Sequence, residues 1–241
     1  MPSAERLAFL DAHLTAVELR DDLVARRVDL LLEAGGKAEL QAAHHALQFR
    51  HFHNWEGSYL IHEAWVEVNQ RLGDSALAAK AFTAAAGYFS AAREYPKNLE
   101  VAPRTPDFRA HLNWDLARLN RALRRLDAER DALRQILAEK YSKPHLGTFY
   151  QARAQKALGN DTAYQSLLRD VEQSAREYAS GKFEYRGSRE IVGHYLLSLV
   201  LEERGDEAGA NQERQVALRL DARARRLALL EAQIDTASAY Q

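Results

Sequence analysis

Histidines are the first residues of this sequence that could take part in chemistry, because five of the nine lie between His44 and His62. Imidazole nitrogens are common ligands of Zn²⁺, and His51 and His53 are separated by a single residue. No His-Glu-x-x-His motif is present, and two histidines at this spacing are weak evidence for zinc. We therefore expect no metal and no other cofactor, and a metal-dependent enzyme is the least favoured class.

Paired carboxylates could serve acid–base catalysis, but their positions favour a structural role. Such catalysis needs two carboxyl groups that face one cleft and have separated pKa values. The acidic pairs at 21–22, 202–203 and 206–207 instead lie where helices are expected to begin or end. Gly-x-Ser-x-Gly is absent, no Ser-His-Asp order stands out, and the chain has no cysteine. The sequence therefore predicts no catalytic residue and a protein that is not an enzyme.

The charge balance argues against several classes of partner. Lys and Arg number 33 against 34 Asp and Glu, which gives a net charge of -1 and no electrostatic reason to bind nucleic acid or anionic lipid. No apolar run approaches the roughly 18 residues that a membrane span needs, and the first residues do not resemble a signal peptide. We expect a cytoplasmic protein that binds neither nucleic acid nor membrane.

A helix–turn–helix unit recurs along the chain and would position the polar residues. Its clearest copy runs over residues 194–222 and turns at Gly205. Similar turns are expected at Gly35, Gly73, Gly159 and, in degenerate form, near Arg124-Arg125. Helix-forming residues dominate, whereas there are only 12 Gly and 5 Pro. This pattern is typical of tetratricopeptide-like repeats.

The repeats predict an all-α fold, a tetratricopeptide-like α-α superhelix (solenoid) of about five helical hairpins plus a C-terminal capping helix. One helical-repeat domain would span residues 1–241. Its approximate units are 3–50, 57–94, 107–141, 144–179 and 189–220, with the cap at 222–238. The cap is expected to place Arg223, Arg225 and Arg226 on a polar outer face.

In such a solenoid the first helix of each hairpin lines a concave surface. Counting back from each turn gives the expected binding residues: Glu63, Glu67, His111, Trp114, Arg118, Phe149, Arg153 and Tyr195. Four more residues are expected on the same surface: Gln70, Arg121, Lys156 and Glu202. Aromatic rings anchor peptides or stack on sugars, and Arg supplies several donors. If Trp114, Arg118, Phe149 and Arg153 form this surface, they are partly exposed. The alternative is that the aromatic members belong to the core between repeats.

Two loop motifs carry a resemblance to a known family. Residues 50–57, Arg-His-Phe-His-Asn-Trp-Glu-Gly, resemble an Arg-x-Phe-His-Pro-Trp-Glu-Gly signature, and residues 94–99 resemble a Glu-Tyr-Pro-x-Asn-Leu-Gly signature. Both occur in the C-terminal tetratricopeptide-like repeat region of a bacterial family of unknown function. Its full members carry a mutarotase-like β-sandwich domain. Asn54 replaces the family's Pro and Glu100 its Gly, so the second loop need not adopt a left-handed turn.

The first motif is expected to be structural, with the Trp55 ring packed between repeats and His53 and Glu56 capping helix ends. Trp55→Ala would then cost about 3–5 kcal/mol. The resemblance implies a link to carbohydrate metabolism. The favoured function is a non-enzymatic scaffold that binds a protein partner, for example a mutarotase-like β-sandwich protein or domain, through its concave face. The alternative is the accessory repeat half of a carbohydrate-active enzyme, which completes a sugar-binding cleft with a β-sandwich domain. The oligomeric state stays open.

Overall fold

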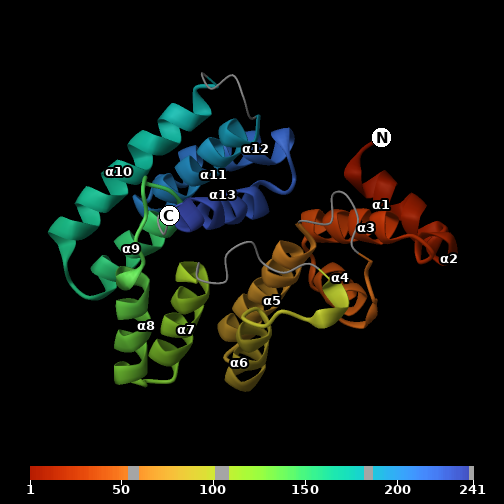
Figure 1. Cartoon of the computed structure of the whole chain (residues 1–241), viewed down its shortest axis with the longest axis horizontal. Coiled ribbons are helices and arrows are strands. Elements are labelled where there is room, and N and C mark those ends of the chain that lie inside the picture. Colours follow the sequence, from red (N-terminus) through yellow and green to blue (C-terminus); the bar gives the residue numbers. More distant parts are fainter. Residues whose placement is uncertain (54–59, 101–108, 182–186, 239–241) are drawn as a thin grey trace. The chain divides into compact units, whose positions relative to one another are not determined.

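The computed structural model describes residues 1–53, 60–100, 109–181 and 187–238. Within these residues every regular element is a helix, with thirteen α-helices and no strand, which confirms the predicted all-α class (Figure 1). The chain divides into two compact units, Met1–Pro103 and Arg104–Gln241. The prediction of one continuous repeat domain stays a prediction.

The first unit is built from packed helix pairs. Its elements are α1 (Ser3–Ala12), α2 (Leu14–Val17), α3 (Asp21–Ala34), α4 (Lys37–Phe49), α5 (Ile61–Ala78), α6 (Phe82–Ala91) and the 3-10 helix η2 (Lys97–Leu99). Helix α3 packs against α4 and α5 against α6, while α1 lies against α3. The core includes Val28, Leu47, Val68 and the two loop residues Phe52 and Leu99, all with no measurable exposure.

The second unit contains three helix pairs and a final helix. They are α7 (Ala110–Ala122), α8 (Leu126–Ala138), α9 (Leu146–Ala157), α10 (Asp161–Ala179), α11 (Gly187–Glu203), α12 (Glu207–Leu220) and α13 (Ala224–Ser238). Each pair, α7 with α8, α9 with α10 and α11 with α12, packs along its length, and α7 also contacts α9. Ile136, Leu168, Val171, Leu196 and Val200 lie fully buried in its core.

The α5–α6, α7–α8, α9–α10 and α11–α12 pairs share one turn. The turn residues Lys80, Arg124, Gly159 and Gly205 have φ of 58°, 58°, 80° and 81°. In each turn this residue donates its N–H to the carbonyl three residues earlier at 3.0 Å, and the next N–H reaches the carbonyl five residues earlier at 2.8–2.9 Å. This is the Schellman arrangement, which satisfies the last carbonyls of the first helix. The predicted turns at 124, 159 and 205 are confirmed, and Gly35 also has a positive φ of 71°.

The predicted turn at Gly73 is wrong, because α5 continues through it to Ala78. A Cβ at Gly73 would lie 2.4 Å from Cε1 of Phe89, whose ring is fully buried. The glycine therefore marks a close approach of α5 to α6, and the chain turns seven residues later, at Lys80. Glycine serves both in turns at positive φ and where two backbones approach closely, and the sequence pattern did not distinguish these two roles.

The polar outer face predicted for the last helix is also wrong at Arg226. This side chain is only 2% exposed, and Ala224, Ala228 and Leu229 of the same helix are buried. Helix α13 packs against α9 and α11 as well as α12. It is therefore an internal element of the second unit, where an arginine must have polar partners to be tolerated.

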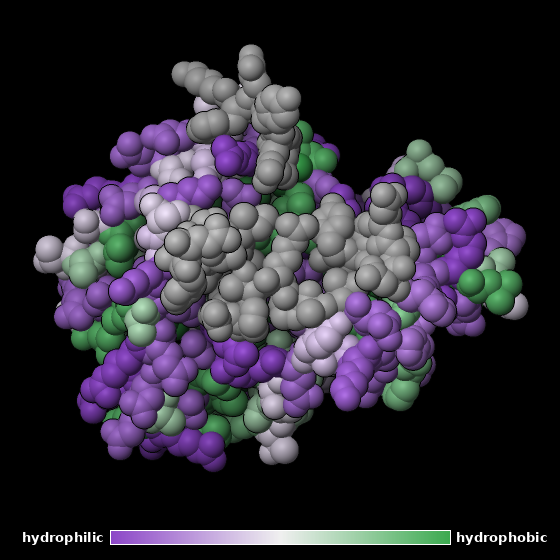
Figure 2. Space-filling model, in the orientation of Figure 1, coloured by the Kyte–Doolittle hydropathy of each residue, from purple (hydrophilic) through white to green (hydrophobic). Residues whose placement is uncertain are grey.

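Hydrophilic residues cover most of the visible face outside the grey regions (Figure 2). The exposed large apolar side chains include Phe9, Leu19 and Phe49 of the first unit. Among the described helices, we find none that combines the length and apolar character needed to cross a membrane.

The shared turn leads to opposite predictions for two of its positions. Gly205→Ala should destabilise the protein by about 1 kcal/mol, because a side chain is disfavoured at positive φ and an added Cβ would have no contact within 4 Å to offset that cost. Arg124→Gly should stabilise it by up to about 1 kcal/mol by removing that strain. Urea unfolding of both variants tests this, and equal losses in both would show that the left-handed conformation is not the determinant.

Two helical glycines form a second matched pair. Gly87→Ala should raise the free energy of unfolding by about 0.5–1 kcal/mol, because its Cβ meets nothing and alanine favours the helix. Gly73→Ala gains the same helix propensity but should lower stability by about 1–3 kcal/mol, because its Cβ overlaps the Phe89 ring. Thermal unfolding measures both. A stabilised Gly73→Ala protein would contradict the close approach.

Candidate functional site

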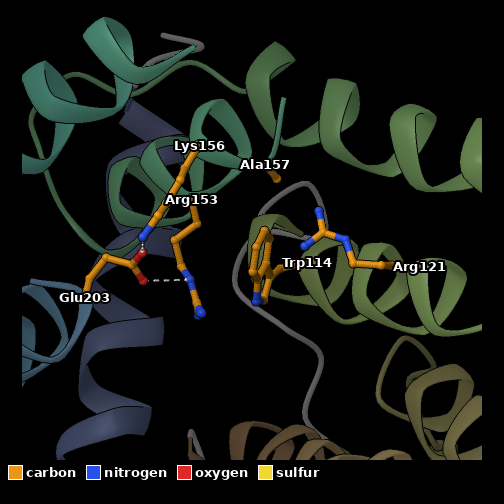
Figure 3. Close-up of a pocket in the computed structure, with 6 residues that line it drawn as sticks. All are labelled: Trp114, Arg121, Arg153, Lys156, Ala157 and Glu203. Atoms are coloured by element: carbon orange, nitrogen blue, oxygen red, sulfur yellow. Dashed lines mark hydrogen bonds and ion pairs between the residues drawn. The ribbon is translucent and has the colours of Figure 1, made fainter. Parts of the chain in front are cut away.

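The second unit contains a pocket of about 400 Å³ (Figure 3). Its lining side chains come from the first helix of each of the three pairs, α7, α9 and α11. They are Trp114, Arg121, Arg153, Lys156, Ala157 and Glu203. Three cationic side chains thus face one carboxylate and one aromatic ring.

The turns position the charged residues of this pocket. Arg121 and Lys156 each lie three residues before a left-handed turn residue, and their carbonyl oxygens accept its N–H at 3.0 Å. Both cations therefore lie in the last turn of a helix, where the negative end of the helix dipole stabilises positive charge. Glu203 is the last residue of α11, two positions before Gly205.

Glu203 is held by two cations. Its Oε2 lies 3.2 Å from Nε of Arg153 and its Oε1 lies 2.7 Å from Nζ of Lys156. The Tyr164 hydroxyl donates to Oε1 at 3.5 Å, and Lys156 lies 4.9 Å from the centre of the Tyr164 ring. The hydrogen bond to Glu203 is the main cause that raises the pKa of Lys156 above its ordinary value. The Lys156 ammonium is therefore charged at neutral pH.

Arg153 also contacts the aromatic part of the pocket. Its guanidinium lies 4.5 Å from the centre of the Trp114 ring and 5.7 Å from that of Phe149. In Figure 3 the Trp114 indole separates Arg121 from the group of Arg153, Lys156 and Glu203. Arg121 is paired with Glu129 of α8 at 2.6 Å. The cations are thus pre-oriented by neighbouring rings and carboxylates.

This arrangement suits the binding of a charged group better than proton transfer. Glu203 is the one carboxylate among the described lining residues, and both of its oxygens contact cations. Acid–base catalysis would require a second carboxyl group or an uncharged base facing the same space. Across the part of the chain that the structure describes, no three His, Asp or Glu side chains gather as metal ligands would.

The structure brings together two of the predicted binding residues, Trp114 and Arg153. The expectation that Trp114 and Phe149 are partly exposed is wrong, because they are 9% and 3% exposed and belong to the core of the second unit. Phe149 nevertheless lies beside Arg153. Arg118 is half-buried and pairs with Asp115 at 3.5 Å on its own helix.

The other predicted binding residues lie elsewhere. His111 is buried, with its ring centre 6.4 Å from that of Tyr150, and Tyr195 packs against the core. Glu63 and Glu67 belong to α5 of the first unit and are both buried, with Glu67 3.4 Å from Arg71 of the same helix.

The sequence pattern missed two lining residues, Ala157 and Glu203, and Glu203 is the one that carries a charge. Counting back from Gly205 gave Glu202, which is exposed and pairs with Arg214 outside the pocket. Glu203 occupies the position that Ala157 has in the preceding pair, two residues before the turn glycine. That shared offset is the signal that could have identified it.

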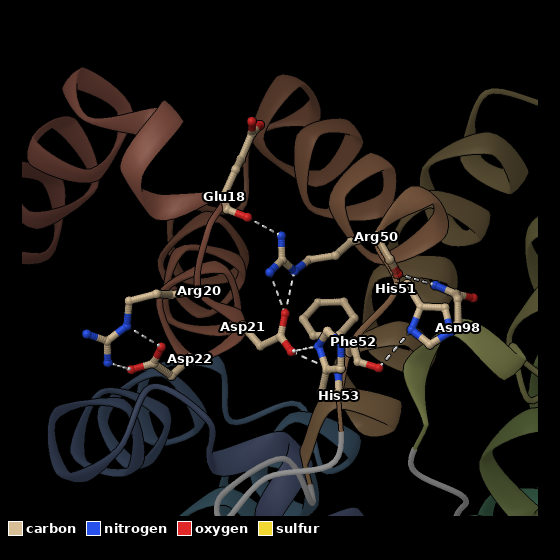
Figure 4. A network of polar contacts seen from close by, with 9 residues as sticks. All are labelled: Glu18, Arg20, Asp21, Asp22, Arg50, His51, Phe52, His53 and Asn98. Carbon is tan, nitrogen blue, oxygen red and sulfur yellow. Dashed lines mark hydrogen bonds and ion pairs between the residues drawn. The ribbon is translucent and has the colours of Figure 1, made fainter.

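The two loop motifs meet in the first unit (Figure 4). Phe52 donates its N–H to the carbonyl of Asn98 at 2.7 Å, and the Asn98 amide donates to the carbonyls of Leu47 and Arg50 at 2.8 and 2.7 Å. Phe52 and Leu99 are fully buried. The described parts of the motifs thus form one hydrogen-bonded element.

Asp21 at the start of α3 anchors the first motif. It accepts hydrogen bonds from the Arg50 guanidinium, from the His53 N–H at 2.8 Å and from the His53 ring at 2.9 Å. Partial burial alone would raise the Asp21 pKa, but these donors together lower it. Trp55 and Glu56 lie outside the described residues, so the Trp55→Ala expectation stays a prediction.

The second loop departs from expectation at Glu100. It has φ 57° and ψ 4°, and its N–H donates to the Lys97 carbonyl at 3.2 Å. The inference that this position need not be left-handed is therefore wrong. Closing η2 requires that conformation even where the side chain is not that of glycine.

The clustered histidines have different polar partners, although the ring centres of His51 and His53 lie 6.0 Å apart. His53 bonds to Asp21, whereas Nε2 of His51 lies 3.6 Å from Glu100. His62 is buried, and its ring centre lies 5.6 Å from that of Tyr95. Burial lowers the pKa of His62 from 6.5 to about 4.

This shift predicts acid destabilisation. Between pH 6.5 and 4 the unfolded chain binds a proton at His62 that the folded chain does not, so stability falls as the pH falls through this window. The loss should reach up to about 3 kcal/mol relative to a His62→Gln variant, measured by urea unfolding at several pH values. The exposed His45→Gln serves as control. A His62→Gln protein with the pH profile of the wild type would contradict the burial effect.

No match was found when the chain was compared with models of known protein families, with curated proteins and with solved structures. The family resemblance of the two loop motifs therefore stays a prediction.

Proposed function

We propose that this chain is a non-enzymatic helical-repeat scaffold that binds a protein partner through the pocket at the ends of α7, α9 and α11. The observation that carries the proposal is the gathering of Arg121, Arg153 and Lys156 around Trp114, with one carboxylate opposite them. Arginine is enriched among the residues that dominate protein–protein binding energies.

A tetratricopeptide-like superhelix is the architecture that we propose for this scaffold. Two observations support it: four helix pairs close with the same hydrogen-bonded turn, and the first helices of successive pairs, α7 and α9, pack together. Repeated pairs that contact their neighbours in this way are the basis of solenoid proteins.

The state of Trp114 favours a protein partner over a sugar. Sugar recognition by stacking needs an open aromatic face, whereas Trp114 is 9% exposed and Arg153 lies over its ring. The accessible groups are instead charged, with Lys156 half exposed and Arg153 one-third exposed. These groups can form ion pairs and hydrogen bonds with polar side chains of a partner.

A non-enzymatic role is supported by the charge states in the pocket. Glu203 is engaged by two cations, and Lys156 has a raised pKa and is therefore a poor nucleophile. We place the protein in the cytoplasm on its sequence features, and connect it to carbohydrate metabolism only through the loop motifs.

The second candidate function is the accessory repeat half of a carbohydrate-active enzyme. The specific observation in its favour is that the loops at 50–53 and 96–99, which carry the family resemblance, bond to each other through Asn98. On this hypothesis, a mutarotase-like β-sandwich domain would complete a sugar-binding cleft.

Partner capture tests the proposal. The immobilised chain is exposed to lysate of the source organism, and bound proteins are quantified for the wild type, Arg153→Ala and the exposed control Arg134→Ala. Arg153→Ala should reduce capture of the main partner about tenfold, and thermal unfolding of the same variant checks that it remains folded. Arg134→Ala should resemble the wild type.

The same preparation separates the two candidate functions. Equal capture by wild type and Arg153→Ala would refute binding through the pocket. Turnover of a sugar substrate by the purified chain, abolished by Glu203→Gln, would refute the scaffold and favour an enzyme. Specific capture of a mutarotase-like β-sandwich protein would favour the accessory role.

A further inference from the structure

Glu203 shows which chemistry the pocket binds. Each of its carboxylate oxygens contacts a different cation, Arg153 at 3.2 Å and Lys156 at 2.7 Å, and the Tyr164 hydroxyl lies 3.5 Å from Oε1. These donors come from α9 and α10, whereas Glu203 comes from α11. The pocket is thus already a carboxylate-binding site, occupied by a side chain of the same protein.

The occupant does not balance the charge around it. Arg153 and Lys156 share the single carboxylate of Glu203, whereas Arg121 is already paired with Glu129 of α8. A second carboxylate entering the pocket would therefore meet an excess of positive charge. Interactions of this kind are stronger where water is partly excluded, as beside the buried Trp114 and Tyr164 rings.

Glu203 is also placed at an unfavourable end of its helix. It is the last residue of α11, where the helix dipole is negative and destabilises a carboxylate. Arg121 and Lys156 lie in the last turns of α7 and α9, where the same effect stabilises them. The helix ends thus stabilise two cations of the pocket and disfavour its one carboxylate, although the Glu203 side chain is only 11% exposed. A competing carboxylate would enter beside Lys156, which is 49% exposed.

From these contacts we infer that Glu203 is an internal competitor for an acidic segment of the protein partner, whose Asp or Glu side chains bind Arg153 and Lys156 in its place. The inference depends on the proposed scaffold function and specifies the partner's chemistry. Glu203 keeps the two cations oriented in the unbound protein and lowers the affinity for weakly acidic segments. Only a segment with several carboxylates competes effectively.

The test uses fluorescence anisotropy of a labelled peptide of alternating Gly and Glu, with Gly-Gln and Gly-phosphoserine peptides as comparisons. Glu203→Gln should tighten binding of the Gly-Glu peptide about tenfold, because the competitor is removed and both cations remain. Lys156→Gln should weaken it by a similar factor. Binding should fall with added salt.

Glu172→Gln is the matched control. Glu172 is also held by two cations, Arg176 at 2.6 Å and Arg204 at 2.5 Å, and is similarly buried, but it lies outside the pocket lining. It should bind the peptide as the wild type does. If Glu203→Gln fails to fold, the half-exposed Lys156→Gln decides the outcome.

Several results would overturn the inference. One is that Glu203→Gln binds the Gly-Glu peptide no more tightly than the wild type does. Others are that the wild type binds the Gly-Gln peptide as tightly as the Gly-Glu peptide, or prefers the Gly-phosphoserine peptide. The last is that the protein binds an acidic oligosaccharide but none of the peptides. If partner capture still depends on Arg153 while the Gly-Glu peptide does not bind, the scaffold function stands and only the acidic segment is refuted. If capture ignores Arg153, the proposed function itself fails.

Discussion

One backbone constraint governs much of this fold, namely a single residue at positive φ that closes each of four helix pairs. The N–H of this residue donates to the carbonyl three residues earlier, and the N–H of the next residue donates to the carbonyl five residues before it. These two hydrogen bonds fix the end of the first helix relative to the start of the second. The second helix begins two residues after the turn residue in all four pairs. The pocket depends on the same constraint, since Arg121, Lys156 and Glu203 all lie within three residues of a turn.

The recurrence of these turns was readable from the sequence, whereas the use of each glycine was not. Gly159 and Gly205 were identifiable because a glycine follows an amphipathic helix, and Arg124 because its spacing fits. Lys80 carries no such signal, and Gly73 mimicked a turn because a close helix contact also selects glycine. Trp114, Arg121, Arg153 and Lys156 lay on the predicted surface, whereas the expected Glu202 is one position away from the lining residue Glu203. That difference rotates a residue by about 100° around a helix, enough to place Glu202 outside and Glu203 inside.

Burial was the least predictable property, because it depends on contacts between elements distant in sequence. Phe149 and Arg226 are internal although helical counting placed them on outer or inner surfaces. The ion pairs of the second unit have the same origin: Glu231 of α13 meets Lys143 at 3.3 Å and Arg189 of α11 at 3.8 Å. Partly buried charges of this kind add little net stability. We infer that they instead help to specify which elements adjoin.

The hydrogen bond between Phe52 and Asn98 separates the first unit from a simple modular array. It joins residues on either side of the α5–α6 pair, so the whole pair is enclosed in a loop whose ends are bonded together. Pairs that contact only their neighbours can be gained or lost by duplication or deletion. Removing or duplicating α5–α6 would instead change the chain between Phe52 and Asn98, so that these two residues could no longer form their hydrogen bond in the same way. We therefore expect a change in repeat number to be tolerated better in other parts of the chain, and a shortened protein for biophysical work should keep residues 47–99 as one piece.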